Sequence, residues 1–326
     1  MRSKWGLGSD PVHEPPPRHH GTLARVFVAL AVSSLGISAF GSAAAAYPVV
    51  GAAGDIACNP RSSYFNGGYG TSTRCHMRQT ARVVSSMSAD RILPLGDIQY
   101  ERGEYSNFLK SYHRSWGRFL SRTRPAPGNH EYETPGATGY FRYFGSRAGS
   151  RTRGYYSFDL GAWHIVALNS NCGEVGGCGP SSPQSRWLAD DLYRHRRQAC
   201  TLAYTHHPRF SSGNEHGNWR ELRYLWKRLD DSGAEAFLSG HEHDYERFAP
   251  LNYLGRRDSK GMVQFVVGTG GRNLRGWGKL QPNTAVRSNR AFGVLKLALH
   301  EGHMGWRFIP EAGESFSDRG NRACRK

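Results

Sequence analysis

The sequence lacks several features that would assign it to other classes of protein. None of its six cysteines forms a Cys-x-x-Cys pair, which argues against a zinc ribbon. The formal net charge is +17, but the basic residues form no run of six or more. A spread excess predicts a basic solvated surface and no specific nucleic-acid binding; a field that concentrates anionic partners near a cleft is the alternative. No internal repeat, low-complexity segment or linker divides residues 47–326, so we expect a single domain there.

The first 46 residues have the order of an export signal. Arg18 and Arg25 precede a mostly apolar stretch over residues 26–40, and a run of small residues follows over 41–46. This order predicts a cleavable signal peptide over residues 1–46. A retained membrane anchor is the alternative, for which the apolar stretch is short and interrupted. We therefore expect a secreted protein with no stable membrane span after cleavage, and retention at the cell surface as the second possibility.

All six cysteines lie after residue 46, where export would favour disulfides. Cys172 and Cys178 bracket a Gly-rich loop and form the favoured pair. Six cysteines allow many other pairings. Cys58 and Cys75 lie close to each other in the sequence, which suggests that they pair. Cys200 and Cys324 are then the two cysteines that remain.

From residue 47 onward, apolar runs that end in Gly-Asp, Gly-Asn or Gly-His alternate with amphipathic segments. The apolar runs predict strands over residues 47–53, 91–95, 201–204 and 236–238, and a hairpin over 155–169. Amphipathic spacing and caps predict helices over 77–87 and 104–120, from Ser182, and from a capping Asn218 to Gly233. Residues 131–154 are expected to form a long surface loop. Past Phe248 we expect antiparallel strands over 262–267, 292–299 and 304–309. The whole predicts a two-layered sheet core flanked by helices.

Five short segments just past these strands carry side chains of the kinds that bind metals. Ligands of such sheets lie outside the carboxyl ends of the strands, so the five segments are expected to converge on one rim. A glycine directly before Asp55, Asp97, Asn129 and His241 permits a tight turn and close backbone approach. Asp97 lies midway in the set and is the natural bridge between two metal ions. The carboxylate, phenol, amide and imidazole candidates are Asp55, Asp97, Tyr100, Asn129, His206, His241 and His243.

The order of these segments resembles the calcineurin-like metallophosphoesterase superfamily and, within it, the purple acid phosphatases. The matching motifs are Asp55-Ile56-Ala57, Gly96 to Tyr100, Gly128 to Glu131, Ala203 to His206 and Gly240 to His243. Tyr100 distinguishes the purple acid phosphatases from the wider superfamily, which lacks a tyrosinate ligand at this position. Ala57 and Ala203 depart from the family pattern, but neither would be a ligand. The resemblance implies an α/β fold (α+β by some schemes), a four-layer α/β/β/α sandwich with two mixed sheets. No fibronectin-like domain precedes this core, so the chain looks like the small single-domain form.

The resemblance also implies roles for individual residues. Asp55, Asp97, Tyr100 and His243 would hold one metal ion, typically Fe(III). Asp97, Asn129, His206 and His241 would hold a second, which is Fe, Zn or Mn in the family. His206 is favoured over its neighbour His207 because it fits the His-x-Pro spacing. Asn129, His130 and His216 would contact the phosphate, and His130 or His216 would protonate the leaving group.

The function that follows is a secreted, dinuclear metal-dependent phosphatase. It would hydrolyse monoesters of phosphorylated small molecules by attack of a metal-bound hydroxide. One alternative is a phosphodiesterase or nucleotidase on the same scaffold. Another is a non-catalytic extracellular metalloprotein that binds polyanions, against which His130 and His216 argue, because binding alone needs no general acid. The sequence fits a monomer and a dimer equally.

Overall fold

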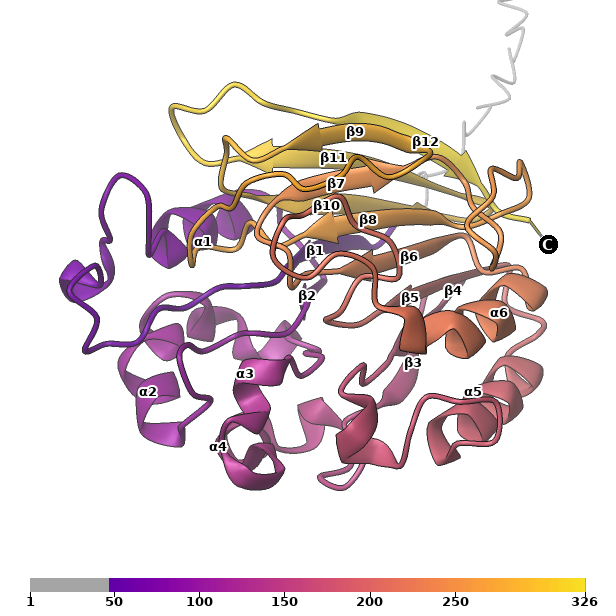
Figure 1. Cartoon of the computed structure of the whole chain (residues 1–326), viewed down its shortest axis with the longest axis horizontal. Helices are drawn as coiled ribbons and strands as arrows, with labels where there is room; N and C mark the ends of the chain where they lie inside the picture. Colours follow the sequence, from indigo (N-terminus) through magenta and orange to yellow (C-terminus); the bar gives the residue numbers. More distant parts are fainter. Residues whose placement is uncertain (1–46, 326) are drawn as a thin grey trace, which may run out of the picture. The chain divides into compact units, whose positions relative to one another are not determined.

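Residues 47–325 are the part of the chain that the computed structural model describes, and two β-sheets organise them (Figure 1). The predicted signal peptide over residues 1–46 lies outside the described residues. The strands of the first sheet are β1 (Val49–Ala53), β2 (Arg91–Pro94), β10 (Gly293–His300), β11 (His303–Pro310) and β12 (Arg319–Ala323). Those of the second are β3 (Tyr156–Leu160), β4 (Trp163–Ala167), β5 (Cys200–Tyr204), β6 (Ala236–Ser239), β7 (Tyr245–Phe248), β8 (Val263–Val267) and β9 (Thr284–Ser288). The α-helices are α1 (Met77–Ser86), α2 (Tyr105–Lys110), α3 (Asn129–Tyr132), α4 (Thr138–Phe144), α5 (Pro183–Arg194) and α6 (Arg223–Asp231).

Both sheets are mixed. The first has the order β12-β11-β10-β1-β2, in which β1 is antiparallel to β10 and parallel to β2. The second has the order β3-β4-β5-β6-β8-β7-β9, with parallel pairing from β4 through β5 and β6 to β8. The expectation of antiparallel strands past Phe248 is confirmed for β10 and β11, while β12, which pairs antiparallel with β11, was not expected. It is incomplete for β8, which is antiparallel to β7 but parallel to β6.

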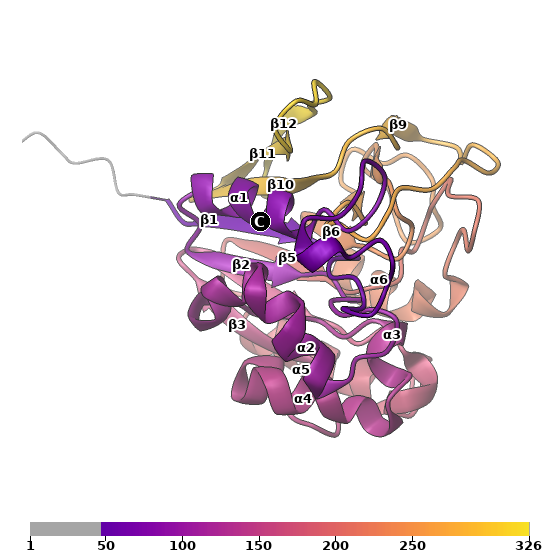
Figure 2. The same cartoon turned by 90° about the vertical axis from the view of Figure 1, so that its left-hand side faces the viewer.

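Alternation along the central strands builds two apolar layers. Leu202 and Leu238 of β5 and β6 pack in the core that includes β1, β2 and β10, whereas Ala203 and Phe237 face the apolar side chains of α5 and α6. The two sheets touch directly, because the rings of Phe265 on β8 and Trp306 on β11 lie 5.5 Å apart. Helix α1 packs on β10 and β11, and α5 and α6 cover the second sheet (Figure 2). The predicted four-layer α/β/β/α arrangement with two mixed sheets is thus confirmed.

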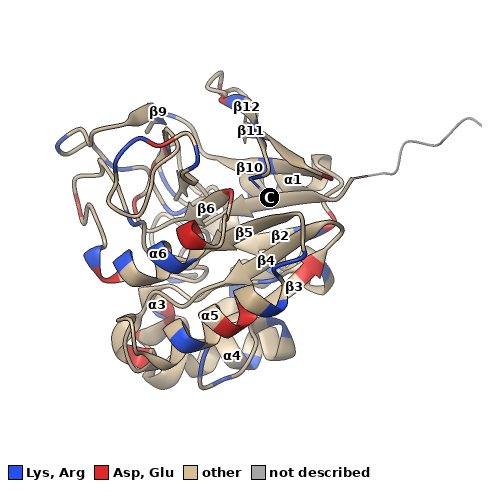
Figure 3. Cartoon of the chain, turned by 90° about the vertical axis from the view of Figure 1, so that its right-hand side faces the viewer, with Lys and Arg blue, Asp and Glu red and all other residues tan. Residues whose placement is uncertain are grey.

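Charged side chains are distributed over the helices and loops. In Figure 3, Lys and Arg alternate with Asp and Glu along α5 and α6, and basic residues recur in the surrounding loops. Among the described residues, no helix is long and apolar enough to cross a membrane.

The predicted loop over residues 131–154 is wrong, because this segment contains α3, α4 and two short 3-10 helices. Tyr140 and Phe144 of α4 are buried, and the Phe144 ring packs edge-on against Phe108 of α2. The aromatic residues follow a helical three-to-four-residue spacing, which the abundance of Gly and Arg obscured.

The predicted helix over residues 104–120 is interrupted. Ser111 and Ser115 leave helical geometry and divide the segment into α2 and two 3-10 helices, Tyr112–Arg114 and Trp116–Arg122. The hydroxyl of Ser111 donates to the carbonyl of Cys58 at 2.7 Å, an example of a serine side chain that competes with the helix.

Two predicted helix starts have different outcomes. Ser182 caps α5 as predicted, since its hydroxyl accepts a hydrogen bond from the backbone of Ser185 at 3.2 Å. Asn218 does not cap α6; its side-chain oxygen accepts from the backbone of Ser211, and α6 begins at Arg223 after a short 3-10 turn.

Three disulfides connect Cys58 with Cys75, Cys172 with Cys178 and Cys200 with Cys324, the pairs that the sequence analysis favoured. The last ties β5 to the chain just after β12.

Candidate metal centre

Hydrogen bonds between the two sheets bring the carboxyl ends of their strands together. The backbone N–H of Gly54, after β1, donates to the carbonyl of Val267 at the end of β8 at 2.8 Å. Asp55 and Asp97 follow β1 and β2 of the first sheet, and His206 and His241 follow β5 and β6 of the second. Ligand-type residues from both sheets therefore meet at one rim, as parallel strand ends allow.

Tyr100 is the centre of the first group of donor atoms. Its hydroxyl oxygen lies 2.8 Å from Oδ1 of Asp55, 2.9 Å from Oδ2 of Asp97 and 3.0 Å from Nε2 of His243. Asp55, Asp97 and Tyr100 are all buried. Because a phenol carries one proton, it can satisfy only one of these three neighbours.

His206 is the centre of the second group. Its Nε2 lies 3.3 Å from Oδ1 of Asp97, 3.1 Å from Oδ1 of Asn129 and 3.0 Å from Nδ1 of His241. The other ring nitrogen of His206 is held by the carbonyl of Leu95 at 2.9 Å, which fixes the orientation of the ring. Asp97 thus directs one carboxylate oxygen to each group.

The chemistry of these donors fits metal cations. Buried carboxylate, phenol and imidazole atoms and the half-buried amide of Asn129 point at one another, and Nε2 of His241 is buried without a hydrogen-bond partner among the described residues. Burial, together with Asp55 and Asp97, raises the pKa of Tyr100 well above its usual value. Burial alone would raise the pKa of Asp97, yet the His206 and His130 imidazoles hold it well below its usual range. A cation among these atoms would remove the repulsion between lone pairs and favour the phenolate.

The backbone at this rim is strained. Asp55, Asp97 and His241 have φ angles of 59°, 46° and 72°, a region that non-glycine residues seldom occupy. Such strain is typical of functional sites, where the surrounding structure enforces it. Close approach also requires glycine at Gly128, because a Cβ atom there would lie 2.1 Å from Oδ1 of Asp97.

The two histidines expected to act on the phosphate lie beside this centre. The Nδ1–H group of His130 donates to the carbonyl of Glu101, and its Nε2 lies 3.7 Å from Oδ2 of Asp97. The ring of His216 stacks on that of His241, with centroids 4.0 Å apart. His207, next to His206, is also buried here, but its Nδ1 lies 2.7 Å from the hydroxyl of Ser170.

Three residues to which the sequence analysis gave no role also shape the rim. Glu131 accepts hydrogen bonds from the backbone of Ile98, Gln99 and Gly128, and burial together with Asp97 raises its pKa to about 7. Glu242 accepts from the backbone N–H groups of His216 and Gly217 at 2.7 and 2.6 Å. Nη1 of Arg275 lies 3.3 Å from Nε2 of His216 and 3.3 Å from the carbonyl of His241. Only Glu131 and Glu242, which lie inside the motifs, had a signal that could have found them.

A further group of acidic and histidine residues lies at β3, β4 and α5. His164 lies between Asp159 and Asp191, at 2.8 and 2.9 Å, and stacks face to face on His195 with centroids 3.9 Å apart. Two parallel stacked rings cannot both direct a nitrogen lone pair in plane at one ion between them, so we interpret this partly exposed cluster as a hydrogen-bond network.

The comparisons with known proteins agree with this geometry. The calcineurin-like phosphoesterase family model matches residues 53–245, more than half of the chain, and the chain belongs to this family. Purple acid phosphatase 15 of Arabidopsis thaliana is 29% identical over 221 residues, which are 56% of this chain and 40% of that protein. Purple acid phosphatase 18 of the same plant is 27% identical over 253 residues, 71% of this chain and 54% of that protein.

Among solved structures, the purple acid phosphatase PPD1 from yellow lupin seeds superposes with a TM-score of 0.65 at 16% identity, covering 85% of this chain and 54% of that one. GAP50 of Plasmodium, the anchor in the inner membrane complex, has a TM-score of 0.60 at 12% identity, covering 86% and 90%. With Tyr100 at the rim, the chain is a metallophosphoesterase of the purple acid phosphatase type. It spans about half the length of the curated relatives it matches.

Proposed function

We propose that this protein is a secreted metal-dependent phosphatase that hydrolyses phosphate monoesters of small molecules, with residues 47–326 as its catalytic domain. The observation that carries the proposal is the position of Asp97, whose two carboxylate oxygens each face a separate set of donor atoms. A carboxylate shared in this way is what a pair of metal ions requires. The three disulfides support export, because such bonds persist in oxidising compartments.

The donor sets define two proposed metal sites. The first consists of Asp55, Asp97, Tyr100 and His243, and its oxygen-rich character suits Fe(III). The second consists of Asp97, Asn129, His206 and His241, and suits Fe, Zn or Mn. When bound, such ions supply Lewis-acid stabilisation of phosphoryl oxygens and lower the pKa of water.

The side chains around the two sites have tasks of their own in this proposal. Arg275 contacts His216 and His241 through Nη1, and no hydrogen bond within residues 47–325 engages its Nε or Nη2, which could therefore bind the phosphoryl oxygens of a substrate. Arginine is always a donor, so Nε2 of His216 accepts here and the imidazole is neutral in this arrangement. To give a proton to a leaving alkoxide, His216 must first become an imidazolium, which requires this contact with Arg275 to open. His130 is oriented by the carbonyl of Glu101, which directs its Nε2 toward Asp97 and the reaction centre.

The test compares a nitrophenyl phosphate monoester with the bis-nitrophenyl diester, from acid to alkaline pH, with metal content measured on the same samples. We expect faster turnover of the monoester, and a loss of at least about a hundredfold in Asp97→Asn. Asp190→Asn is the matched control, because it removes an exposed carboxylate on α5.

Two other results would redirect the proposal. A preference for the diester would favour a phosphodiesterase on the same scaffold. A protein that binds two metals and turns over neither ester would favour a non-catalytic binding role.

A further inference from the structure

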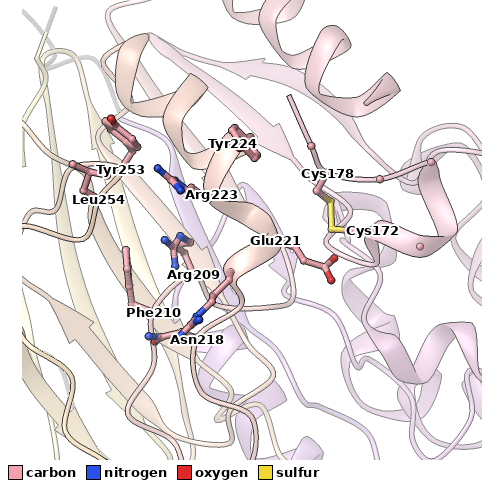
Figure 4. A pocket seen from close by; sticks show the side chains of 15 residues that line it. Cys172, Cys178, Arg209, Phe210, Asn218, Glu221, Arg223, Tyr224, Tyr253 and Leu254 are labelled. Atoms are coloured by element: carbon pink, nitrogen blue, oxygen red, sulfur yellow. A yellow bond between two sulfur atoms is a disulfide. The ribbon is translucent and has the colours of Figure 1, made fainter. Parts of the chain in front are cut away.

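A pocket of about 1080 Å³ lies between the Cys172–Cys178 loop and the start of α6 (Figure 4). Arg209, Arg220 and Arg223 line it, and we call it the arginine pocket. In Figure 4, Arg223, Arg209 and Asn218 follow one another along one side of the view, and the Cys172–Cys178 disulfide is on the other side. Tyr253 and Leu254 close one edge.

No ion pair within residues 47–325 neutralises the arginines of this pocket. Within residues 47–325, none of the three arginines forms an ion pair, and Nε of Arg209 is buried without a hydrogen-bond partner. Glu221, the acidic residue of the lining, pairs with none of them in the same range. Burial, together with the charges of Arg223 and Arg220, lowers the pKa of Arg209 to about 10. Arg209 is half-buried, whereas Arg220 and Arg223 are exposed. Their like charges repel one another, and an anion bound between them would replace this repulsion with attraction.

The arginine pocket lies close to the metal centre along the chain. Arg209 lies three residues after His206, so the chain between them spans at most about 11 Å. The ring of Trp219 stacks on His207 with centroids 4.1 Å apart, and its backbone N–H donates to the carbonyl of Pro208 at 2.9 Å. The segment between Arg209 and the metal centre is therefore well packed.

We propose that the arginine pocket is an oxyanion subsite, distinct from the metal centre, that binds a phosphoryl group. Guanidinium groups offer planar forks of N–H donors that match phosphate oxygens, and Arg223 opens α6, whose amino end also favours an anion. The phosphoryl group belongs either to a free phosphate-type anion or to a second position of a substrate with two phosphoryl groups.

The first experiment measures binding alone. The probe is methylenediphosphonate, a diphosphate analogue that has no P–O–P bond to cleave, titrated by calorimetry into the full-length protein in the wild-type and Asp97→Asn backgrounds. Because Asp97→Asn impairs the metal centre, binding that remains in this background reports on the pocket. The variants are Arg209→Gln and Arg223→Gln, and Arg197→Gln is the matched control, since Arg197 is an exposed arginine after α5.

We expect the dissociation constant to rise about tenfold or more in Arg209→Gln and Arg223→Gln. It should change less than about twofold in Arg197→Gln. Equal affinities in all variants would overturn the proposal, as would an equal loss in Arg197→Gln, which would indicate general surface charge. Unchanged thermal unfolding of each variant excludes misfolding as the cause of a loss. None of these outcomes depends on turnover, so they are independent of the proposed phosphatase activity.

A kinetic experiment distinguishes the two sources of the phosphoryl group. If the substrate supplies it, Arg223→Gln should raise KM for fructose bisphosphate about tenfold and leave KM for fructose monophosphate unchanged. If both KM values stay unchanged while methylenediphosphonate binding is lost, the ligand of the pocket is a free anion.

Discussion

Glu242 lies between the two histidines of the Gly-His-x-His motif, and we predict that it acts by holding His216 in position. Its Oε1 accepts hydrogen bonds from the backbone N–H groups of His216 and Gly217, at 2.7 and 2.6 Å. Glu242 is fully buried, whereas His216 is exposed at the rim. Glu242→Ala would therefore release the segment that carries His216 without touching that side chain itself.

The expected magnitude follows from these two bonds. Each of the two hydrogen bonds, if made to a charged carboxylate, contributes about 1.5–3 kcal/mol. Water recovers part of their sum, because the released segment is exposed and its N–H groups can be solvated. A net loss of about 1.5–3 kcal/mol would lower the population of correctly placed His216 by about ten- to a hundredfold. We expect kcat for the monoester to fall by that factor while KM changes little, because the donors of the metal sites stay in place.

The assay is a double-mutant cycle on kcat with His216→Ala. If Glu242 acts through His216, Glu242→Ala should change kcat by less than about threefold once His216 is absent. Glu242→Gln should restore part of the activity, because its amide oxygen still accepts both bonds. Glu215→Ala, which removes a neighbouring exposed carboxylate, is the control. An equal loss of kcat in both backgrounds, or loss of bound metal from Glu242→Ala, would refute this reasoning.

Three further predictions concern the centre and the scaffold. Gly128→Ala should at least halve the metal content measured by elemental analysis, because its Cβ would lie 2.1 Å from Oδ1 of Asp97. Replacement of both Cys200 and Cys324 by Ser should lower the free energy of unfolding in denaturant titrations by about 4–5 kcal/mol, since the disulfide closes a loop of 124 residues. Burial raises the pKa of Glu246 in the folded state above the usual 4.5. Between these two pKa values the folded protein binds more protons than the unfolded chain. The free energy of unfolding should therefore fall as pH rises from 4.5 through the raised pKa. Denaturant titrations across this pH range should show a smaller fall in Glu246→Gln, which has no carboxyl group to ionise.

The parts of the fold that the sequence predicts well are those where burial is continuous. The strands β1, β2, β5 and β6 are apolar on both faces because each lies between covering layers, so their runs are evident without knowledge of the partners. The sequence does not predict helix α4, because the Gly and Arg content of this segment resembles a loop. Its helical side is defined by Phe144, which packs against α2 in the folded protein. Local composition cannot report that contact.

The residues of the metal centre also divide into those that the sequence predicts and those that it does not. Side chains that lie just past a strand could be predicted as its donors, because parallel strands end at one edge. Arg275 could not, since it meets His216 across 59 residues of sequence in a segment without a motif. The arginine pocket was not predicted either, because Arg209 and Arg223 come together only when the segment after β5 folds back along α6.

Each group of donors draws on both sheets, and this explains why the rim requires so many strained residues. The first group takes three donors from segments after strands of the first sheet and His243 from the second sheet. The second group takes Asp97 from the first sheet, while His206 and His241 follow strands of the second. The backbone N–H of His241 also donates to Oδ2 of Asp55 at 2.8 Å, so one residue with positive φ orients another across the boundary between the sheets. The strain is thus balanced by contacts between sheets that form only in the complete fold, which fixes the donors before any cation arrives and reduces the ordering cost of binding one.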